Sequence, residues 1–290
     1  MDAVAAMYVA QGIHGLAYGM MLFLIAAGLT LIFGMMGILN LAHAGFFMLS
    51  AYFGYQIVAW GGNYWMALIF APLITGFIGV LVERFILRKL VATGLPNQLL
   101  VTQAMVFVII GLVQAKWGSE YLPFLPPESL NGLVDIAGLQ YPEYRLFMIG
   151  VSLALLIFMI FILHKTRLGM IVRAVVSDAE MVDALGINVP LVFMVVFGVG
   201  TWMAGLAGVV IAPVVSVHPY LGDQVGMDAF VVVITGGFGS LGGAFLVAIA
   251  LGLLNSFGIQ FISQYAMVLT FLFMAVVLAI KPTGLFGERE

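Results

Sequence analysis

The sequence predicts an all-α polytopic membrane protein, a helical bundle forming a single transmembrane domain over residues 1–290. Two observations predict this fold class. Only 8% of the residues are charged and 64% are hydrophobic, whereas a soluble domain carries about 25% charged residues. Several apolar stretches also approach or exceed the about 20 residues that a helix needs to cross a bilayer. The absence of cysteine excludes disulfides and thiolate metal sites.

Seven apolar stretches are predicted to span the membrane. The first follows a segment without Lys or Arg, so we expect a permanent span rather than a cleaved secretory signal, which needs a basic start. The seven stretches cover residues of about 11–33, 41–60, 64–82, 99–115, 144–163, 191–212 and 265–280.

The basic residues predict how the chain is oriented. They concentrate in the loop 84–89, in the segment 164–190 and near the C-terminus, and the positive-inside rule assigns such places to the cytoplasm. The loops 116–143 and 213–226 hold few basic residues and are predicted to be external. Counting spans backwards then places the N-terminus outside and the C-terminus in the cytoplasm.

This orientation requires that residues 228–263 begin and end on the same side of the membrane. A single straight crossing cannot satisfy that requirement. We therefore predict a glycine-broken helix or a re-entrant pair, a type of element that is tolerated only where it is buried in protein or lines a cavity. The glycines expected to make the break are Gly236, Gly237, Gly239, Gly242 and Gly243.

The sequence supports neither a Rossmann-type nor a P-loop nucleotide-binding site. Residues 237–242 match G-x-G-x-x-G, but no Asp or Glu occurs between Asp228 and Glu288 to bind a ribose, so packing and helix breaking are favoured. None of the four lysines follows a glycine, as a P-loop lysine must. The chain is therefore predicted to be no ATPase. No cofactor, metal or nucleic-acid partner is predicted, since the histidines are scattered and no basic stripe is present.

A short helix is predicted in the cytoplasmic segment 164–190. Ser177 and Glu180 have the spacing of a capping box, and Gly186 supplies a C-terminal stop. Met181 and Leu185 share one face at i, i+4. The helix is either a solvated part of the loop or a docking element for a cytoplasmic partner. The residues that we assign to such coupling are Arg173, Ser177, Asp178, Glu180, Met181, Asp183, Leu185 and Gly186.

A polar pair interrupts the second apolar stretch. Asn40 and His43 stand at i, i+3, which places them on one helix face, and Phe47 and Ser50 extend that face. Polar groups inside a membrane usually face a cavity or the bundle interior. They either form an interhelical hydrogen bond, worth about 0.6 kcal/mol, or line a solute pathway.

The acidic residues bear on the class of transporter. We expect all thirteen Asp and Glu residues to lie outside the central apolar runs. Carriers coupled to protons or sodium usually keep an ionisable group within the membrane. This distribution disfavours a secondary carrier.

These motifs also carry a family resemblance over nearly the whole length. The chain resembles the permease subunits of ABC importers for branched-chain amino acids and related small solutes. One departure is Ala44, where the family commonly has glycine after the histidine, which affects the local backbone and the pore width. The resemblance rests on the segments Gly28–Gly34 and Asn40–His43, Thr166–Gly169 and Ala184–Asn188, Gly236–Ser240 with Gly242–Gly243, and Lys281–Gly287.

The resemblance implies an assembly in a bacterial inner membrane. It would contain a second permease, as copy or paralogue, two ATPase subunits and a periplasmic solute-binding protein. In this family, the segment matching Ser177–Gly186 is the coupling helix, and the surroundings of Asn40 and His43 belong to the translocation pathway. The solute would be a branched-chain or other amino acid. The alternatives are a channel or secondary carrier for a small polar solute such as urea or an amide, and a membrane-embedded enzyme, for which no nucleophile or metal cluster is visible.

Overall fold

The computed structural model describes residues 3–90, 94–136 and 138–287 as a bundle of helices with one small hairpin. The hairpin, β1 (Leu133–Ile136) paired antiparallel with β2 (Leu139–Pro142), lies in the loop predicted to be external and was not predicted. The helices are α1 (Ala3–Met36), α2 (Ala42–Ala59), α3 (Tyr64–Val82), η1 (Glu83–Leu87), α4 (Arg88–Leu90), α5 (Leu95–Trp117), η3 (Glu128–Leu130), α6 (Glu143–Lys165), α7 (Arg167–Ser177), α8 (Ala179–Ala184), α9 (Val189–Val215), α10 (Leu221–Gly236), α11 (Leu241–Ile262), η4 (Ser263–Tyr265) and α12 (Ala266–Ile280).

The polytopic bundle is confirmed. Among the described residues, six helices are long and apolar enough to cross a membrane. Five of them coincide with predicted spans, and the sixth, 241–265, falls in the broken region. The predicted second span is α2, which is largely buried inside the bundle. The six candidate spans are Met7–Met36, Tyr64–Leu90, Pro96–Trp117, Glu143–Lys165, Val189–Val215 and Leu241–Tyr265.

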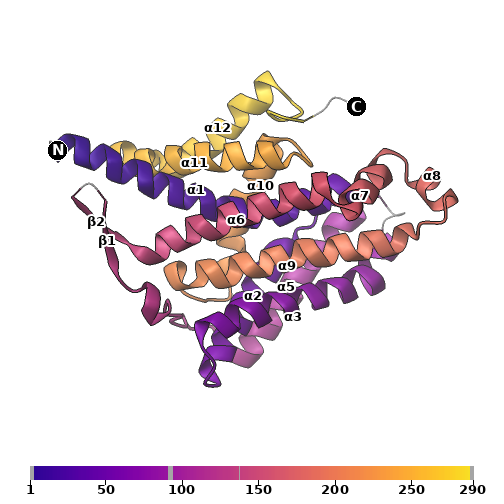
Figure 1. Ribbon diagram of the computed structural model, residues 1–290, viewed down its shortest axis with the longest axis horizontal. Coiled ribbons are helices and arrows are strands. Elements are labelled where there is room, and N and C mark those ends of the chain that lie inside the picture. Colours follow the sequence, from indigo (N-terminus) through magenta and orange to yellow (C-terminus); the bar gives the residue numbers. More distant parts are fainter. Residues whose placement is uncertain (1–2, 91–93, 137, 288–290) are drawn as a thin grey trace.

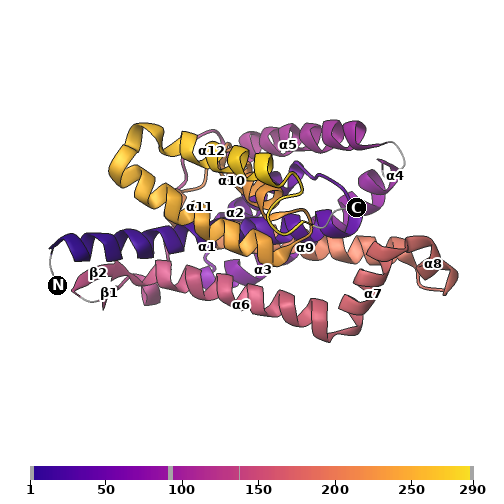
Figure 2. The ribbon, with the colours of Figure 1, turned by 90° about the horizontal axis from the view of Figure 1, so that it is seen from above.

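The two ends of the molecule separate the segments as the charge pattern predicts. Figure 1 shows α7, α8 and the C-terminus toward the right, and the N-terminus with the β-hairpin at the left. Figure 2 adds α4, which contains Arg88 and Lys89 of the basic loop, to the right-hand group. The three basic segments therefore share one end of the bundle.

The glycine break lies between α10 and α11, at residues 237–240. Gly237 and Gly239 adopt φ of 99° and 78°, which favours glycine. The predicted glycine break is present, but the two helices that flank it extend beyond or differ from the predicted bounds 228–263. The second arm, α11, has 22 residues and can cross a membrane by itself, and the first arm, α10, starts at Leu221 rather than at 228.

The C-terminal segment packs on this break. The N–H groups of Leu285 and Phe286 donate to the carbonyl oxygens of Thr235 and Gly236, at 2.8 and 3.1 Å. A Cβ on Gly237 would lie 2.8 Å from Cα of Gly287, so only glycine allows this approach. The carbonyl groups at the end of α10 are thereby satisfied inside the protein.

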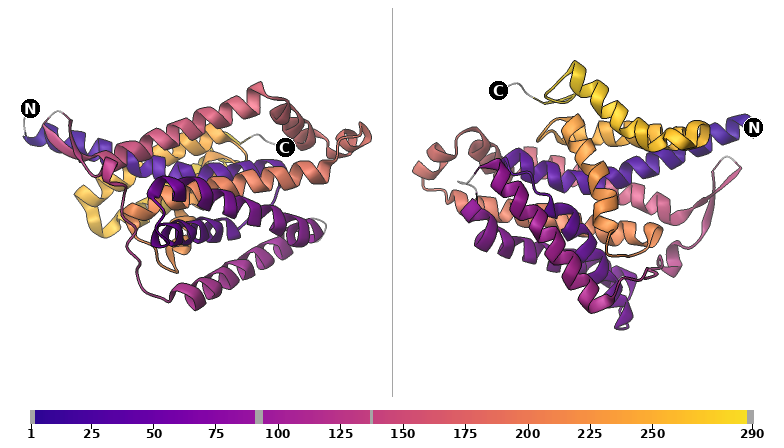
Figure 3. Two further views of the ribbon diagram at one scale, coloured as in Figure 1. Left: turned by 60° about the horizontal axis from the view of Figure 1, so that its bottom comes forward. Right: turned by 180° about the vertical axis from the view of Figure 1, so that it is seen from behind.

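Helix α1 lies at the centre and packs against α6, α9, α10 and α11, while α5 and α12 lie on opposite outer sides (Figure 3). Gly15 and Gly19 form a G-x-x-x-G pair that lets the α1 and α11 backbones touch. A Cβ on Gly19 would lie 2.6 Å from the carbonyl oxygen of Ala248, and one on Gly15 would lie 2.8 Å from Cα of Leu253.

Replacing Gly19 by alanine is expected to destabilise the bundle, because backbone atoms of α11 cannot yield as a flexible side chain could. Overpacking of this kind costs about 1–3 kcal/mol. The measurement is the thermal unfolding midpoint in detergent. The matched control is Gly12→Ala in the same helix, where a Cβ would meet nothing within 4 Å. Equal midpoints for the two variants would contradict a close glycine contact between α1 and α11.

Candidate functional site: a buried polar cluster and an exposed loop helix

The predicted polar pair occupies the entry to α2 rather than one continuous helix face. Helix α2 begins at Ala42, so Asn40 lies in the turn before it. The backbone N–H of His43 donates to the carbonyl oxygen of Asn40 at 3.2 Å, which closes this turn. The expected i, i+3 relation therefore comes from a turn followed by a helix.

All four residues of the predicted stripe are buried, and each polar member has at least one side-chain atom without a partner among the described residues. Asn40, Phe47 and Ser50 are 0% exposed and His43 is 1% exposed. The Nε2–H of His43 donates to the carbonyl oxygen of Ile25 at 3.1 Å. Its Nδ1, both polar side-chain atoms of Asn40 and the Ser50 hydroxyl have no hydrogen-bond partner in the described part of the chain. Leaving such groups unpaired costs about 1–3 kcal/mol each.

Three further residues with the same property were missed from the sequence. The side-chain hydroxyls of Thr30 on α1, Tyr52 on α2 and Thr235 on α10 are also buried without a partner among the described residues. Thr30 lies in the Gly28–Gly34 motif. That motif could have indicated Thr30 from the sequence, but no role was assigned to this residue. Tyr52 continues α2 beyond Ser50. The unpaired polar groups therefore come mostly from α2 and from the helices around it.

Glycines of neighbouring helices surround α2. A Cβ on Gly28 of α1 would lie 2.9 Å from Cε1 of His43, and one on Gly205 of α9 would lie 3.0 Å from Oγ of Ser50. Ala44, the departure from the family pattern, faces α10, where a Cβ on Gly222 or on Gly226 would come within 2.6 Å of it. The extra methyl group of Ala44 is therefore accommodated by glycine on the opposite helix.

The main cavities of the described residues are lined by other side chains, so the four stripe residues form a closed interior. Their contribution to a solute pathway stays a prediction.

The loop helix is α8, and its N-terminal cap differs from the prediction. Oδ1 of Asp178 accepts the N–H of Met181 at 2.9 Å, so Asp178 is the N-cap. The expected capping box of Ser177 and Glu180 is wrong, because α7 continues through Ser177. The adjacent Val175 is buried against Val182 and Val189, and this contact supports the last turn of α7.

The C-terminal stop of α8 is confirmed. Gly186 has φ of 84°, its N–H donates to Asp183, and the N–H of Ile187 donates to Val182. These two bonds form a Schellman motif, and Ile187 packs near Val182 as that motif usually requires. On the outer side of α8, Met181 and Leu185 are 59% and 73% exposed. Both acids of the helix, Glu180 and Asp183, are exposed as well.

An ion pair with a buried carboxylate ties the basic loop to the start of α9. Glu83, in the π-helical turn η1, is 1% exposed and pairs with Arg88 at 2.9 Å. The same guanidinium donates to the carbonyl oxygen of Pro190 at 2.9 Å. The segment that carries α8 is therefore connected to the end of α3 through Arg88, a partly exposed side chain that is held by the buried carboxylate of Glu83.

Arg173 and Asp228 lie in places that the sequence did not indicate. Arg173 lines a cavity between α1, α6 and α7 and is not part of α8. Asp228 lies in the middle of α10, half-buried, and accepts a hydrogen bond of 2.7 Å from the Tyr18 hydroxyl on α1. The expectation that every Asp and Glu lies outside the central apolar runs is therefore wrong for Asp228, and Glu83, at the end of another run, is buried as well.

Comparison with known proteins identifies similar chains. A family model described as "Branched-chain amino acid transport system / permease component" matches residues 13–278. The chain is 29% identical to the high-affinity branched-chain amino acid transport system permease protein LivH of Escherichia coli K12, over 98% of this chain and 96% of that protein. It is also 29% identical to BraD of Pseudomonas aeruginosa, a permease protein with the same description, over 98% and 97%.

More distant similarities extend over comparable lengths. A probable branched-chain amino acid transport permease protein LivH of Methanocaldococcus jannaschii is 24% identical, over 93% of this chain and 90% of that protein. Among solved structures, PsaBC from Streptococcus pneumoniae in complex with Fab matches with a TM-score of 0.51 at 12% identity, over 94% and 92% of the two chains. At this identity the match shows a shared fold alone.

The cap assignment yields a direct test. Asp178→Ala is expected to destabilise α8 by about 1 kcal/mol, because the N–H of Met181 loses its acceptor. Ser177→Ala is the control and should leave α8 unchanged. The measurement is hydrogen exchange of the α8 amides, which should speed up roughly fivefold in Asp178→Ala alone. If the α8 amides exchange faster in Ser177→Ala instead, the N-cap is Ser177 and the capping-box assignment is correct.

Proposed function

The chain belongs to the family of branched-chain amino acid transport permease components, and we propose that it moves a branched-chain or other amino acid from the periplasm to the cytoplasm as part of an ATP-driven importer. The observation that carries this proposal is the family match across residues 13–278, which includes all six candidate spans in whole or in part. A multi-pass helical membrane protein is the form that such a component requires.

ATP hydrolysis is assigned to other subunits. No lysine of the chain follows a glycine, so a P-loop cannot form. In the proposed assembly two ATPases lie in the cytoplasm, and α8 transmits their movement. Its exposed Met181 and Leu185 offer apolar contact area, and its cap and Schellman stop hold a helix that is too short to be stable alone.

The assembly also needs one partner within the membrane and one in the periplasm. A second permease, either a copy or a paralogue, would complete the pathway, and a periplasmic solute-binding protein would deliver the amino acid. The N-terminus and the β-hairpin would then face the periplasm. The end with α4, α7, α8 and the C-terminus would face the cytoplasm, because it carries the concentrated basic residues.

The buried polar groups around α2 support a pathway through the protein. A helix packing role would be served better by groups that bond to each other, whereas Asn40, His43 and Ser50 keep unpaired polar atoms in the interior. We propose that these groups meet the amino and carboxylate groups of the solute when the pathway opens. The closed arrangement then corresponds to a state between solute passages.

One observation favours a second candidate function, a secondary carrier. Asp228 is an ionisable group within α10, hydrogen-bonded to Tyr18, and such groups are typical of ion-coupled carriers. The two functions differ in what drives uptake. A carrier would transport solute in liposomes with this chain alone, whereas the importer needs the ATPases and ATP.

Uptake by the reconstituted assembly tests the function and the pathway together. Asn40→Leu and His43→Leu should each reduce ATP-dependent amino acid uptake at least tenfold while assembly with the partners is retained, since an apolar side chain cannot bond the solute. The control is Thr75→Val, which removes a buried hydroxyl already bonded to the carbonyl oxygen of Ala71 and should preserve uptake. Normal uptake by both leucine variants would restrict Asn40 and His43 to packing.

Single cysteines test the orientation, because the native chain has none. A cysteine at Asn131, in the loop before the β-hairpin, should react in intact cells with a membrane-impermeant thiol reagent that has reached the periplasm. One at Asp183 on α8 should react only after lysis. Both residues are exposed on the surface of the chain, so a difference in labelling reports the side of the membrane on which each residue lies. The opposite labelling pattern would invert the topology.

A further inference from the structure

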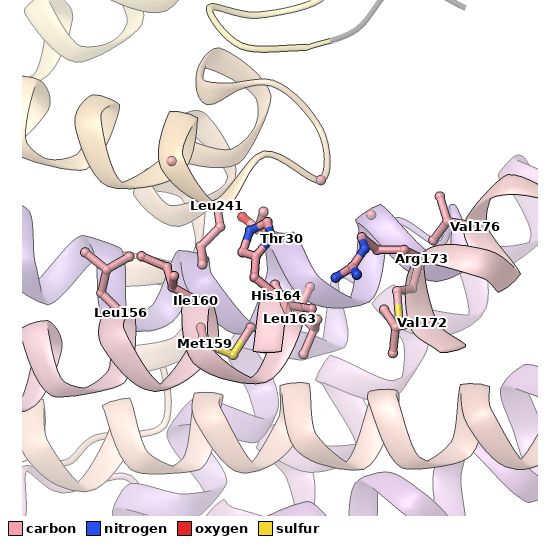
Figure 4. A pocket seen from close by; sticks show the side chains of 15 residues that line it. Thr30, Leu156, Met159, Ile160, Leu163, His164, Val172, Arg173, Val176 and Leu241 are labelled. Atoms are coloured by element: carbon pink, nitrogen blue, oxygen red, sulfur yellow. The ribbon is translucent and has the colours of Figure 1, made fainter. Parts of the chain in front are cut away.

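A cavity of about 650 Å³ lies beside the last turns of α1, between α6 and the glycine break (Figure 4). Ile160 and Val176 on its lining are 47% and 53% exposed, so it opens on the outer surface of the bundle. Helix α7 covers the end that is nearest to α8. The residues used below are Thr30, Leu156, Ile160, His164, Arg173 and Leu241.

Three polar side chains, those of Thr30, His164 and Arg173, interrupt a lining that is otherwise apolar. Figure 4 shows Leu156, Ile160 and Leu241 at one end, His164 beside Thr30 in the middle, and Arg173 toward the other end. Arginine is charged at every physiological pH. Of the described residues that line the cavity, none is Asp or Glu. The polar end therefore attracts an anion, whereas the other end suits hydrocarbon.

Thr30 supplies a specific indication of a ligand. Thr30 lines the cavity but is only 2% exposed, and its buried hydroxyl has no hydrogen-bond partner among the described residues. A buried hydroxyl is costly to leave unpaired, by about 1–3 kcal/mol. A ligand oxygen inside the cavity would satisfy it.

The N-terminus of α11 adds a second attraction for negative charge. Ser240 caps this 22-residue helix by accepting the N–H of Gly243, and Leu241 and Gly242 of its first turn line the cavity. The partial positive charge at a helix N-terminus favours phosphate or carboxylate groups. Gly239 and Gly242 carry no side chain that would cover these backbone groups.

We propose that this cavity binds an anionic phospholipid. The phosphate lies between Arg173, the Thr30 hydroxyl and the N-terminus of α11, and an acyl chain lies along Leu156, Ile160 and Leu241. The opening toward the outer surface and the apolar end favour a lipid over a soluble anion. Basic pockets between membrane helices at the cytoplasmic side bind such headgroups. Assignment to the cytoplasmic leaflet rests on the proposed orientation.

The bound lipid would link two parts of the protein that the polypeptide joins only indirectly. Its headgroup contacts α7, which leads directly into α8, and the loop at the break between α10 and α11. The lipid thereby couples the position of the loop helix to the broken element.

Native mass spectrometry of the full chain, purified with the subunits that accompany it, tests the site. The probe is phosphatidylglycerol, with phosphatidylcholine as the uncharged reference. The wild type should retain one phosphatidylglycerol under conditions that remove phosphatidylcholine. Arg173→Gln should weaken retention roughly tenfold or more, as expected for the loss of a charge-assisted hydrogen bond. Thr30→Val, which preserves shape, should weaken it several-fold.

The matched control is Arg167→Gln, the same charge change in α7 at an exposed residue outside the cavity. It should retain phosphatidylglycerol like the wild type. Equal losses for Arg167→Gln and Arg173→Gln, or equal retention of both lipids, would overturn the site. Displacement by inorganic phosphate would show a site for soluble anions, and displacement by leucine would assign the cavity to the solute; either result overturns the lipid. None of these readouts uses transport, so failure of the proposed function remains separately detectable.

Discussion

Hydrocarbon offers no partner to a backbone N–H or carbonyl group, and this constraint governs the structure. Long helices satisfy it within themselves. The break at residues 237–240 cannot, so its flanking carbonyl groups are met by Leu285 and Phe286 from the C-terminal segment. The same constraint explains why the irregular entry to α2, around Asn40, is surrounded by protein on every side.

Close backbone approach is the second organising feature, and glycine makes it possible. Gly15 and Gly19 bring α1 against α11, Gly28 brings it against His43, and Gly205 brings α9 against Ser50. Because lipid tails are as apolar as the side chains, helices gain little from apolar contact alone and associate through such tight packing. The polar cluster around α2 is therefore held in the interior by neighbours that have no side chain to interpose. A rigid enclosure with unpaired polar groups is consistent with a pathway that opens by movement of whole helices.

Composition and periodicity predicted the fold well, because span length and charge placement are properties of local sequence. The same holds for the Gly186 stop, where a positive φ is required. The N-cap of α8 was misassigned because Ser177 and Asp178 are both good caps, and the choice depends on how Val175 packs against Val182. Similarly, α10 begins at Leu221 because Gly222 and Gly226 fit against Ala44. The sequence indicated Asn40, His43 and Ser50, but the burial of the Thr30 and Thr235 hydroxyls without partners among the described residues is a tertiary property.

The contact between the C-terminal segment and the glycine break also has a consequence for biogenesis. Residues 284–287 leave the ribosome about fifty residues after the carbonyl groups of Thr235 and Gly236 that they must cover. Helices α10 and α11 can therefore be inserted but cannot reach their final arrangement until residues 284–287 have also been synthesised. Closure of the glycine break thus becomes a step that follows insertion of α10 and α11, and it depends on a segment that lies beyond α12 in the chain.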